Sequence, residues 1–216
     1  MAELRNGREG SEVEMKFSRL EIFVEEPSME AALNHIVPKI LGDRLDFYIY
    51  TFQCKDDLLA HLPERLAGYQ RWIPDDLIVL ILVDKDREDC KKLKAKIEKI
   101  IADKRLRSKT SSPTAFNVVT RIVIEELESW FFGDMAAVRL AYPKVSATVE
   151  KKAAYRVPDE IKGGTWEALE RVLRNAGYFK SGLRKIELAR TVAQHMEPAR
   201  NNSQSFQLFV QTLEAL

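Results

Sequence analysis

The sequence predicts an α/β fold with a mostly parallel four-stranded sheet, helices on both faces of the sheet, and a C-terminal helical extension. Short apolar runs alternate with longer amphipathic stretches from residue 20 to about residue 135, which is the pattern of repeated βα units. One run, residues 77–83, is apolar throughout, as expected of a central parallel strand that helices cover on both faces. Beyond Asp134 the apolar spacing is helical and is broken at prolines and glycines.

The first strand is expected at residues 20–24, because Pro27 cannot continue it. Ser28 is the expected cap of the helix that follows, since a serine side chain can accept a hydrogen bond from the first helical turn. The second strand, residues 47–52, is rich in aromatic and β-branched side chains, which favour strands. These two units therefore begin a βαβ pattern.

The helix after the second strand is expected to be capped by Asp56 or Asp57. The third strand, residues 77–83, is the clearest element of the chain, and a long basic helix is expected after it at residues 89–105. The fourth strand is expected at residues 116–124. A sheet order of 2-1-3-4 would then place the first and third strands side by side.

The composition predicts one sizeable core, because the chain has 216 residues of which 45% are hydrophobic. We expect residues 1–16 to be a disordered tail, residues 17–135 to form the α/β domain, and residues 136–216 to form a helical extension packed on it. Two distant cysteines and three scattered histidines disfavour a disulfide scaffold or a structural zinc site. No apolar run is long enough to span a membrane and no export signal is evident, so a cytoplasmic protein is expected.

Acidic side chains follow three of the four predicted strands. Glu25 follows the first strand, and Asp84 and Asp86 follow the third. A third group follows the fourth strand and includes Glu125, Glu126 and Glu128. The carboxyl ends of parallel strands lie at one rim of the sheet, where ligands of α/β proteins bind. We therefore expect Glu25 and the Asp84/Asp86 pair to converge there.

Converging carboxylates repel one another, so at neutral pH they need a cation. Oxygen ligands without histidine or thiolate suit Mg²⁺ or Mn²⁺, which often bridge carboxylates to substrate phosphates. Such an ion neutralises charge on a phosphoryl centre and activates a water or hydroxyl nucleophile, which makes phosphodiester chemistry the sharpest hypothesis. The alternative is that each acid only caps a helix or solubilises a turn.

The acids lie in stretches that resemble known motifs. Residues 24–30, which include Glu25, resemble the first-strand glutamate motif of Toprim domains, and residues 83–86 resemble their D-x-D motif. Further stretches resemble one bacterial Toprim-like family, domain of unknown function family four-two-seven-six, whose members are often encoded beside an ATPase. These stretches are residues 83–90, 124–134, 158–161 and 203–206, and the similarity covers about residues 17–216.

The resemblance implies a Toprim-like, Rossmann-like fold that processes nucleic acid. It implies that Glu25, Asp84 and Asp86 hold Mg²⁺ or Mn²⁺ and carry the catalysis, with Glu128 as a further metal-binding acid. Such families are suspected nuclease subunits of prokaryotic defence systems, which act on DNA or RNA with an ATPase partner. The chain departs from the usual Toprim motif at Glu26, where glycine normally follows the glutamate.

Two lysines are candidates for binding substrate. Lys55 follows the second strand at the same rim and has the charge to neutralise a substrate phosphate, but it equally fits an exposed loop lysine. Lys185 belongs to the more basic C-terminal part and is either a phosphate contact or an ordinary solvated charge. A basic run at residues 91–109 has the same two interpretations, a solvated helix face or a surface for a phosphate backbone.

Three functions fit these residues. The first is a metal-dependent nuclease. The second is a non-catalytic metal- or nucleotide-binding module of an ATPase complex, in which the same rim binds a ligand without cutting. The third is a small-molecule phosphotransferase on a receiver-like fold, which would form an aspartyl-phosphate on Asp84. No glycine-rich phosphate loop is present, so an ATPase activity of the chain itself has no support.

Overall fold

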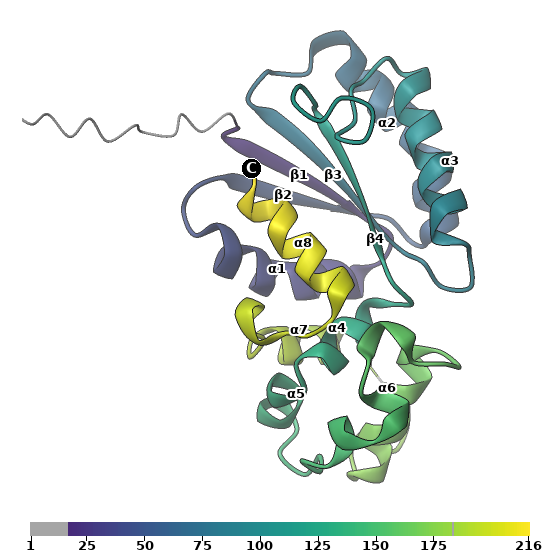
Figure 1. The fold of residues 1–216 in the computed structure, drawn as a ribbon, viewed down its shortest axis with the longest axis vertical. Helices are drawn as coiled ribbons and strands as arrows, with labels where there is room; N and C mark the ends of the chain where they lie inside the picture. The colour runs from purple at the N-terminus through teal and green to yellow at the C-terminus, as the bar shows by residue number, and fades with distance from the viewer. Residues whose placement is uncertain (1–16, 183) are drawn as a thin grey trace, which may run out of the picture.

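The computed structural model describes residues 17–182 and 184–216 and confirms the α/β fold (Figure 1). The predicted tail, residues 1–16, lies outside the described residues. One parallel sheet is present in the described residues, with the strand order β2-β1-β3-β4. This order makes β1 and β3 neighbours, which is the condition for the expected convergence of Glu25 and Asp84. The strands are β1 (Arg19–Val24), β2 (Asp46–Thr51), β3 (Leu77–Asp84) and β4 (Val118–Val123).

Helices follow each strand, and the C-terminal third is helical as predicted. The α-helices are α1 (Pro27–Leu41), α2 (Lys55–Trp72), α3 (Cys90–Asp103), α4 (Leu127–Gly133), α5 (Met135–Ala141), α6 (Thr165–Asn175), α7 (Lys185–Ala193) and α8 (Gln204–Glu214). Short 3₁₀ turns are η1 (Val149–Lys151), η2 (Ala153–Tyr155), η3 (Pro158–Glu160) and η4 (Pro198–Arg200). In the described chain, no helix is both long and apolar enough to cross a membrane.

Side chains alternate between two hydrophobic clusters on opposite faces of the sheet. Phe23 of β1 packs with Leu62 and Ile97 under α2 and α3, while Ile22 beside it packs with Ile36 of α1. Helix α8 returns from the C-terminal part to cover the same face as α1 (Figure 1). Strand β3 is buried along its whole length, which explains why its sequence is uniformly apolar.

Two of the expected helix caps are wrong. Helix α1 begins at Pro27 with Glu26 in the N-cap position, and the Ser28 hydroxyl donates to the Glu26 carboxylate instead of capping. Proline suits this first helical position because its missing N–H would have no partner there. Helix α2 begins at Lys55, so Asp56 and Asp57 lie in its first turn, where acids complement the helix dipole.

Other boundaries differ by one or two residues. Strand β4 is shorter than the expected residues 116–124. Just before it, the Asn117 N–H donates to the Arg107 carbonyl while the Asn117 carbonyl still accepts from Val79 of β3. Helix α3 ends at Asp103, and its cap is Asp89, whose carboxylate accepts hydrogen bonds from the N–H groups of Lys91 and Lys92. These differences move no strand end away from the rim.

The C-terminal part packs at the carboxyl ends of the strands, where α4, α5 and α6 lie below the sheet in Figure 1. Trp130 of α4 is fully buried against Phe206 and Phe209 of α8, so it belongs to the core. Gly133 ends α4 against Asn201, and a Cβ there would lie 2.0 Å from its Oδ1. The helical part and the sheet therefore share one hydrophobic core.

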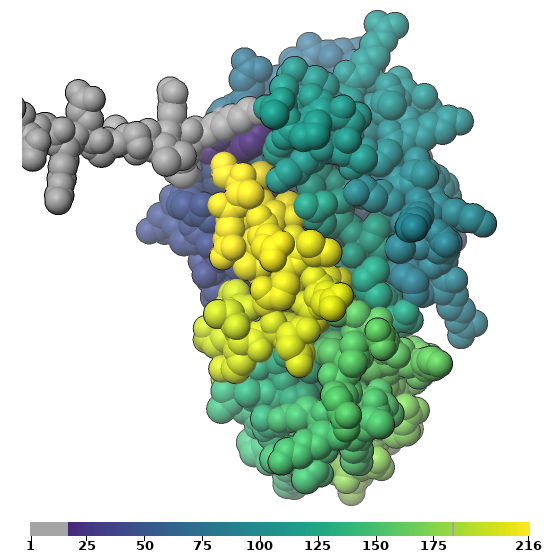
Figure 2. Space-filling view, viewed as in Figure 1, coloured from purple at the N-terminus to yellow at the C-terminus, as the bar shows by residue number. Residues whose placement is uncertain are grey.

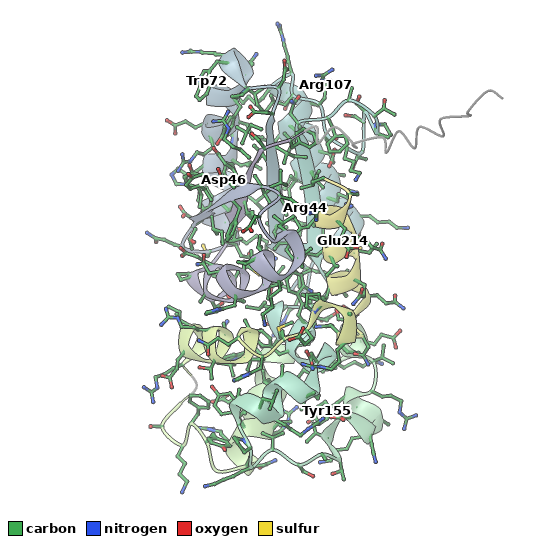
Figure 3. All side chains as sticks on the ribbon, turned by 90° about the vertical axis from the view of Figure 1, so that its left-hand side faces the viewer. Arg44, Asp46, Trp72, Arg107, Tyr155 and Glu214 are labelled. Atoms are coloured by element: carbon green, nitrogen blue, oxygen red, sulfur yellow. The ribbon has the colours of Figure 1, made fainter. Side chains whose placement is uncertain are left out.

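Residues 158–161 and residues 203–206 are distant in sequence but meet at the start of α8. The Asp159 carboxylate accepts hydrogen bonds from the hydroxyls of Ser203 and Ser205, at 2.9 and 2.7 Å, and from the Gln204 N–H at 2.6 Å. At the other end of α8, Arg44 donates to the carbonyl of Glu214, and both are labelled in Figure 3. These contacts hold α8 across the face of the sheet.

Candidate functional site

The sheet brings Glu25 and Asp84 into contact, as the strand order predicted. Val24 at the end of β1 pairs with Leu82 of β3, so the residues that follow lie side by side at the rim. The Asp84 N–H donates a hydrogen bond of 2.6 Å to Oε1 of Glu25. Both side chains are almost fully buried, with exposed fractions of 6% for Glu25 and 5% for Asp84.

Asp84 has an incompletely paired carboxylate. Its Oδ2 accepts a hydrogen bond of 3.2 Å from the N–H of Leu127, at the start of α4. Its Oδ1 is buried without a hydrogen-bond partner among the described residues. Burial raises the pKa of Asp84 well above its ordinary value, and the nearby carboxylates of Glu25 and Glu128 raise it further.

Glu128 and Glu25 also have carboxyls that resist ionisation. Glu128 lies in the first turn of α4 with only 2% of its surface exposed, and burial raises its pKa to about 8. Burial raises the pKa of Glu25 to about 7, although the Asp84 N–H and the charge of Lys55 act in the opposite direction. Three carboxyls with raised pKa values thus meet at one rim, and such groupings are typical of functional sites.

Asp86, unlike the three buried acids, forms an ion pair with Lys55. Its Oδ2 is 2.5 Å from Nζ of Lys55, and the same ammonium donates to the carbonyl of Asp84 at 2.9 Å and approaches Oε1 of Glu88 at 3.1 Å. Lys55 therefore holds the β3–α3 loop, and its ammonium is occupied by protein oxygens. The structure thus gives this lysine a positioning contact, while its predicted binding to substrate stays a prediction.

The backbone at the rim adopts unusual conformations. Asp86 and Glu125 both have positive φ angles, 50° and 62°, which side-chain-bearing residues rarely adopt. Their loops are joined by a hydrogen bond of 2.8 Å from the Asp86 N–H to the Glu125 carbonyl, and Lys85 reaches Oε1 of Glu125 at 2.7 Å. Such strain persists only where the surrounding structure enforces it, and it is common at functional sites.

Lys185 reaches the same rim from the C-terminal part. Its Nζ lies 3.6 Å from Oε2 of Glu26 and 4.7 Å from the ring centre of Trp166. Burial alone would lower the pKa of Lys185, but the carboxylates of Glu26 and Glu128 outweigh this effect and raise it. A charged ammonium from α7 thus faces the buried acids.

These side chains line one cavity of about 310 Å³, which we call the acidic cavity. Its lining consists of Glu25, Glu26, Gln53, Cys54, Lys55, Asp56, Asp84, Asp86, Glu126, Glu128 and Lys185. A neighbouring hollow of about 620 Å³ shares Lys55, Asp56, Asp86 and Glu126 with it and extends past Lys85 and Arg87. All six sequence-predicted site residues therefore face the acidic cavity.

Sequence reasoning missed the structural part that Glu126 plays. Its Oε2 accepts hydrogen bonds from the Thr165 hydroxyl at 2.9 Å and from the Trp166 N–H at 2.8 Å. Glu126 thus joins the start of α6 to the rim. Its place after β4 was visible in the sequence, but its partners are some 40 residues away and had no local signal.

The chemistry of the donor set suits a hard divalent cation, since several carboxylates line the cavity and one oxygen, Asp84 Oδ1, has no hydrogen-bond partner among the described residues. The set is not closed: among residues 17–182 and 184–216, no three His, Cys, Asp or Glu side chains are grouped closely enough to hold a metal ion. Mg²⁺ and Mn²⁺ commonly complete their shells with water and substrate phosphate, so an open set of this kind fits them.

Comparison with known proteins identifies the family. The family described as Domain of unknown function (DUF4276) matches residues 24–214, so the chain belongs to this family. The match begins at the end of β1 and extends into α8, and so includes every residue of the acidic cavity. Neither the curated proteins nor the solved structures contain a significant match to the chain.

Proposed function

We propose that this family member binds Mg²⁺ or Mn²⁺ in the acidic cavity and cleaves phosphodiester bonds of DNA or RNA. One observation carries the proposal: Glu25, Asp84 and Glu128 are buried together at the rim, and one oxygen of Asp84 has no partner. Buried carboxylates are costly without a compensating cation. A purely structural role leaves that cost unexplained.

In this proposal the cation takes one or two ligands from Glu25, Asp84 and Glu128 and completes its shell with water and substrate phosphate, and Asp86 contributes when Lys55 releases it. The bound ion would neutralise charge that develops on the phosphoryl group and make an attacking water more acidic. Without metal, burial raises the pKa of Glu25 to about 7, so this carboxyl is partly protonated near neutral pH. As a ligand it would release that proton when the cation binds.

Lys55 and Lys185 have different parts in this proposal. Lys185 enters the cavity from α7 and remains charged beside Glu26, so it is placed to pair with a substrate phosphate. Lys55 fixes the carbonyl of Asp84 and the side chain of Asp86, and so positions the β3–α3 loop. We further propose a cytoplasmic protein that works with an ATPase partner in prokaryotic defence, a proposal that rests on the resemblance alone.

A second function is favoured by the open donor set. No closed group of three metal ligands exists among the described residues, and Asp86 is already paired with Lys55. These facts suit a module that binds a metal or a nucleotide for assembly with an ATPase and cuts nothing. The two functions differ in whether nucleic acid is cleaved.

Cleavage assays distinguish them. The chain is incubated, alone and with the ATPase partner, with single- and double-stranded DNA and with RNA in millimolar Mg²⁺ or Mn²⁺. We expect cutting by the wild type and a loss of at least about a hundredfold in Asp84→Asn. Asp75→Asn makes the same charge change at the opposite, exposed end of β3 and should cut normally.

Equal cutting by Asp84→Asn and wild type would contradict the catalytic assignment. Metal binding without cutting, in the presence of the partner, would instead support the non-catalytic module.

A further inference from the structure

Helix α3 and the loop after it carry a dense group of basic side chains. Nine lysines and arginines lie between residues 91 and 109, against two acids, Glu98 and Asp103. We call these nine residues the basic face: Lys91, Lys92, Lys94, Lys96, Lys99, Lys104, Arg105, Arg107 and Lys109. The total charge of the chain is only +1, so this is a local excess.

The lysines of α3 stand on the side of the helix that faces away from the sheet. Leu93, Ile97 and Ile101 are buried against the sheet. Lys92, Lys96 and Lys99 are exposed and recur at intervals of four and three residues, so they form one stripe along the helix. In Figure 2 the segment that contains α3 lies at the outer edge of the molecule, away from the C-terminal helical part.

The charges of the basic face are not neutralised within the protein. In the part of the chain that the structure describes, none of the nine side chains is in an ion pair. Glu98, the acid in the middle of α3, is turned to the loop, where the hydroxyls of Ser108 and Thr110 donate to it. Five lysines on one 14-residue helix therefore repel one another, although Asp89 at the helix start attracts Lys91 and Lys92.

The basic face begins beside the acidic cavity. Helix α3 starts at Cys90, directly after the loop of Asp84 and Asp86, and the hollow next to the cavity includes Arg87. From there α3 runs about 21 Å, at 1.5 Å per residue, toward Arg107. Figure 3 shows Arg107 at the opposite end of the molecule from Tyr155, so the basic face leads from the rim to the far end of the α/β part.

We propose that the basic face binds the phosphate backbone of a nucleic acid and leads the strand into the acidic cavity. The length of α3 matches about six base pairs of a duplex, at 3.4 Å of rise along the axis for each. The acidic cavity has few free cations of its own, so affinity for a polyanion must come from a separate surface. The inference rests on the proposed function, because it assigns the surface to the substrate of that cavity.

Binding without metal tests this inference separately from catalysis. Fluorescent DNA and RNA duplexes are titrated with protein in EDTA over a range of salt concentrations. The triple variant Lys92→Gln, Lys96→Gln, Lys99→Gln should bind at least about tenfold more weakly, and the slope of log affinity against log salt should fall by about 2 to 3. The control is a second triple variant, Lys151→Gln, Lys152→Gln, Lys162→Gln, which removes the same charge from exposed positions of the C-terminal part. It should leave the affinity and its salt dependence unchanged.

Equal binding by the α3 triple variant and wild type, or equal losses in both triple variants, would overturn the inference. So would a wild type that binds neither duplex but binds phosphatidylserine vesicles through these lysines. Asp84→Asn should bind the duplexes as wild type does, so loss of cutting in that variant with intact binding separates the two proposals. Unfolding temperatures of all variants confirm that each is folded.

Discussion

Asp84 makes two hydrogen bonds at the rim and leaves one carboxylate oxygen unpaired among the described residues. Its backbone N–H binds Glu25, its Oδ2 binds the start of α4, and its Oδ1 has no partner among the described residues. The carboxylate of Glu128, from α4, repels the carboxylate of Asp84, as that of Glu25 does. Such an arrangement costs stability, and the cation that we propose would offset that cost.

Replacing Asp84 by asparagine should stabilise the protein while it removes function. The amide keeps an oxygen for the Leu127 N–H and removes the buried charge that Glu25 and Glu128 oppose. We expect the free energy of unfolding at pH 8 in EDTA to rise by on the order of 1 kcal/mol, measured by urea unfolding. Asp75→Asn should change it little; a clear loss of stability in Asp84→Asn would mean that the carboxylate is structural.

The raised pKa values fix the pH dependence of stability without metal. The carboxyls of Glu25 and Glu128 titrate near 4.5 when exposed, but at about 7 and about 8 in the folded protein. Between these values the folded state holds protons that the unfolded state has lost, so stability falls as pH rises from about 4.5 to about 8.

The unfolding temperature in EDTA should therefore fall by on the order of 5 °C across this window, followed by circular dichroism. Glu128→Gln should flatten the upper part of the decrease. A wild-type stability that stays constant or increases over the same range would refute the assignment of buried, neutral carboxyls.

At the scale of elements, the chain uses distant contacts to fix the ends of helices. Asp159 binds three donors at the start of α8, and Glu126 binds two at the start of α6. These acids satisfy N–H and hydroxyl groups that a helix start leaves unpaired. Residues 158–161 and 203–206, two of the stretches that resemble the family, therefore have a structural role, because they bind each other at the start of α8.

Asp159→Ala should destabilise the protein through α8. The change leaves the Gln204 N–H and two buried serine hydroxyls without their acceptor, which costs about 1 to 3 kcal/mol. Urea unfolding measures the loss, and Glu160→Ala, at the exposed neighbouring position, serves as the control. Equal stability of the two variants would show that Asp159 does not hold α8.

For the whole molecule, the sequence sufficed for the sheet and for much of the rim. Uniform apolarity of β3 and the acids after β1, β3 and β4 placed Glu25 and Asp84 on one rim, because parallel strands end on one side, and their contact further required that β1 and β3 be neighbours. The partners of Lys55 and the approach of Lys185 to Glu26 were not predictable, since they depend on loop conformation and on how α7 packs. The predicted caps of α1 and α2 were wrong, because these helices begin at Pro27 and Lys55, before the expected cap residues.

The central claim is that the acidic cavity binds a divalent cation, and calorimetric titration with Mg²⁺ and Mn²⁺ tests it most directly. The wild type and Asp75→Asn should bind the metal, and Asp84→Asn should not, because its unpartnered oxygen is replaced by an amide nitrogen that cannot serve as a ligand. Metal should also raise the unfolding temperature of the first two proteins only. Absence of binding at millimolar metal, or equal binding by Asp84→Asn, would contradict the claim.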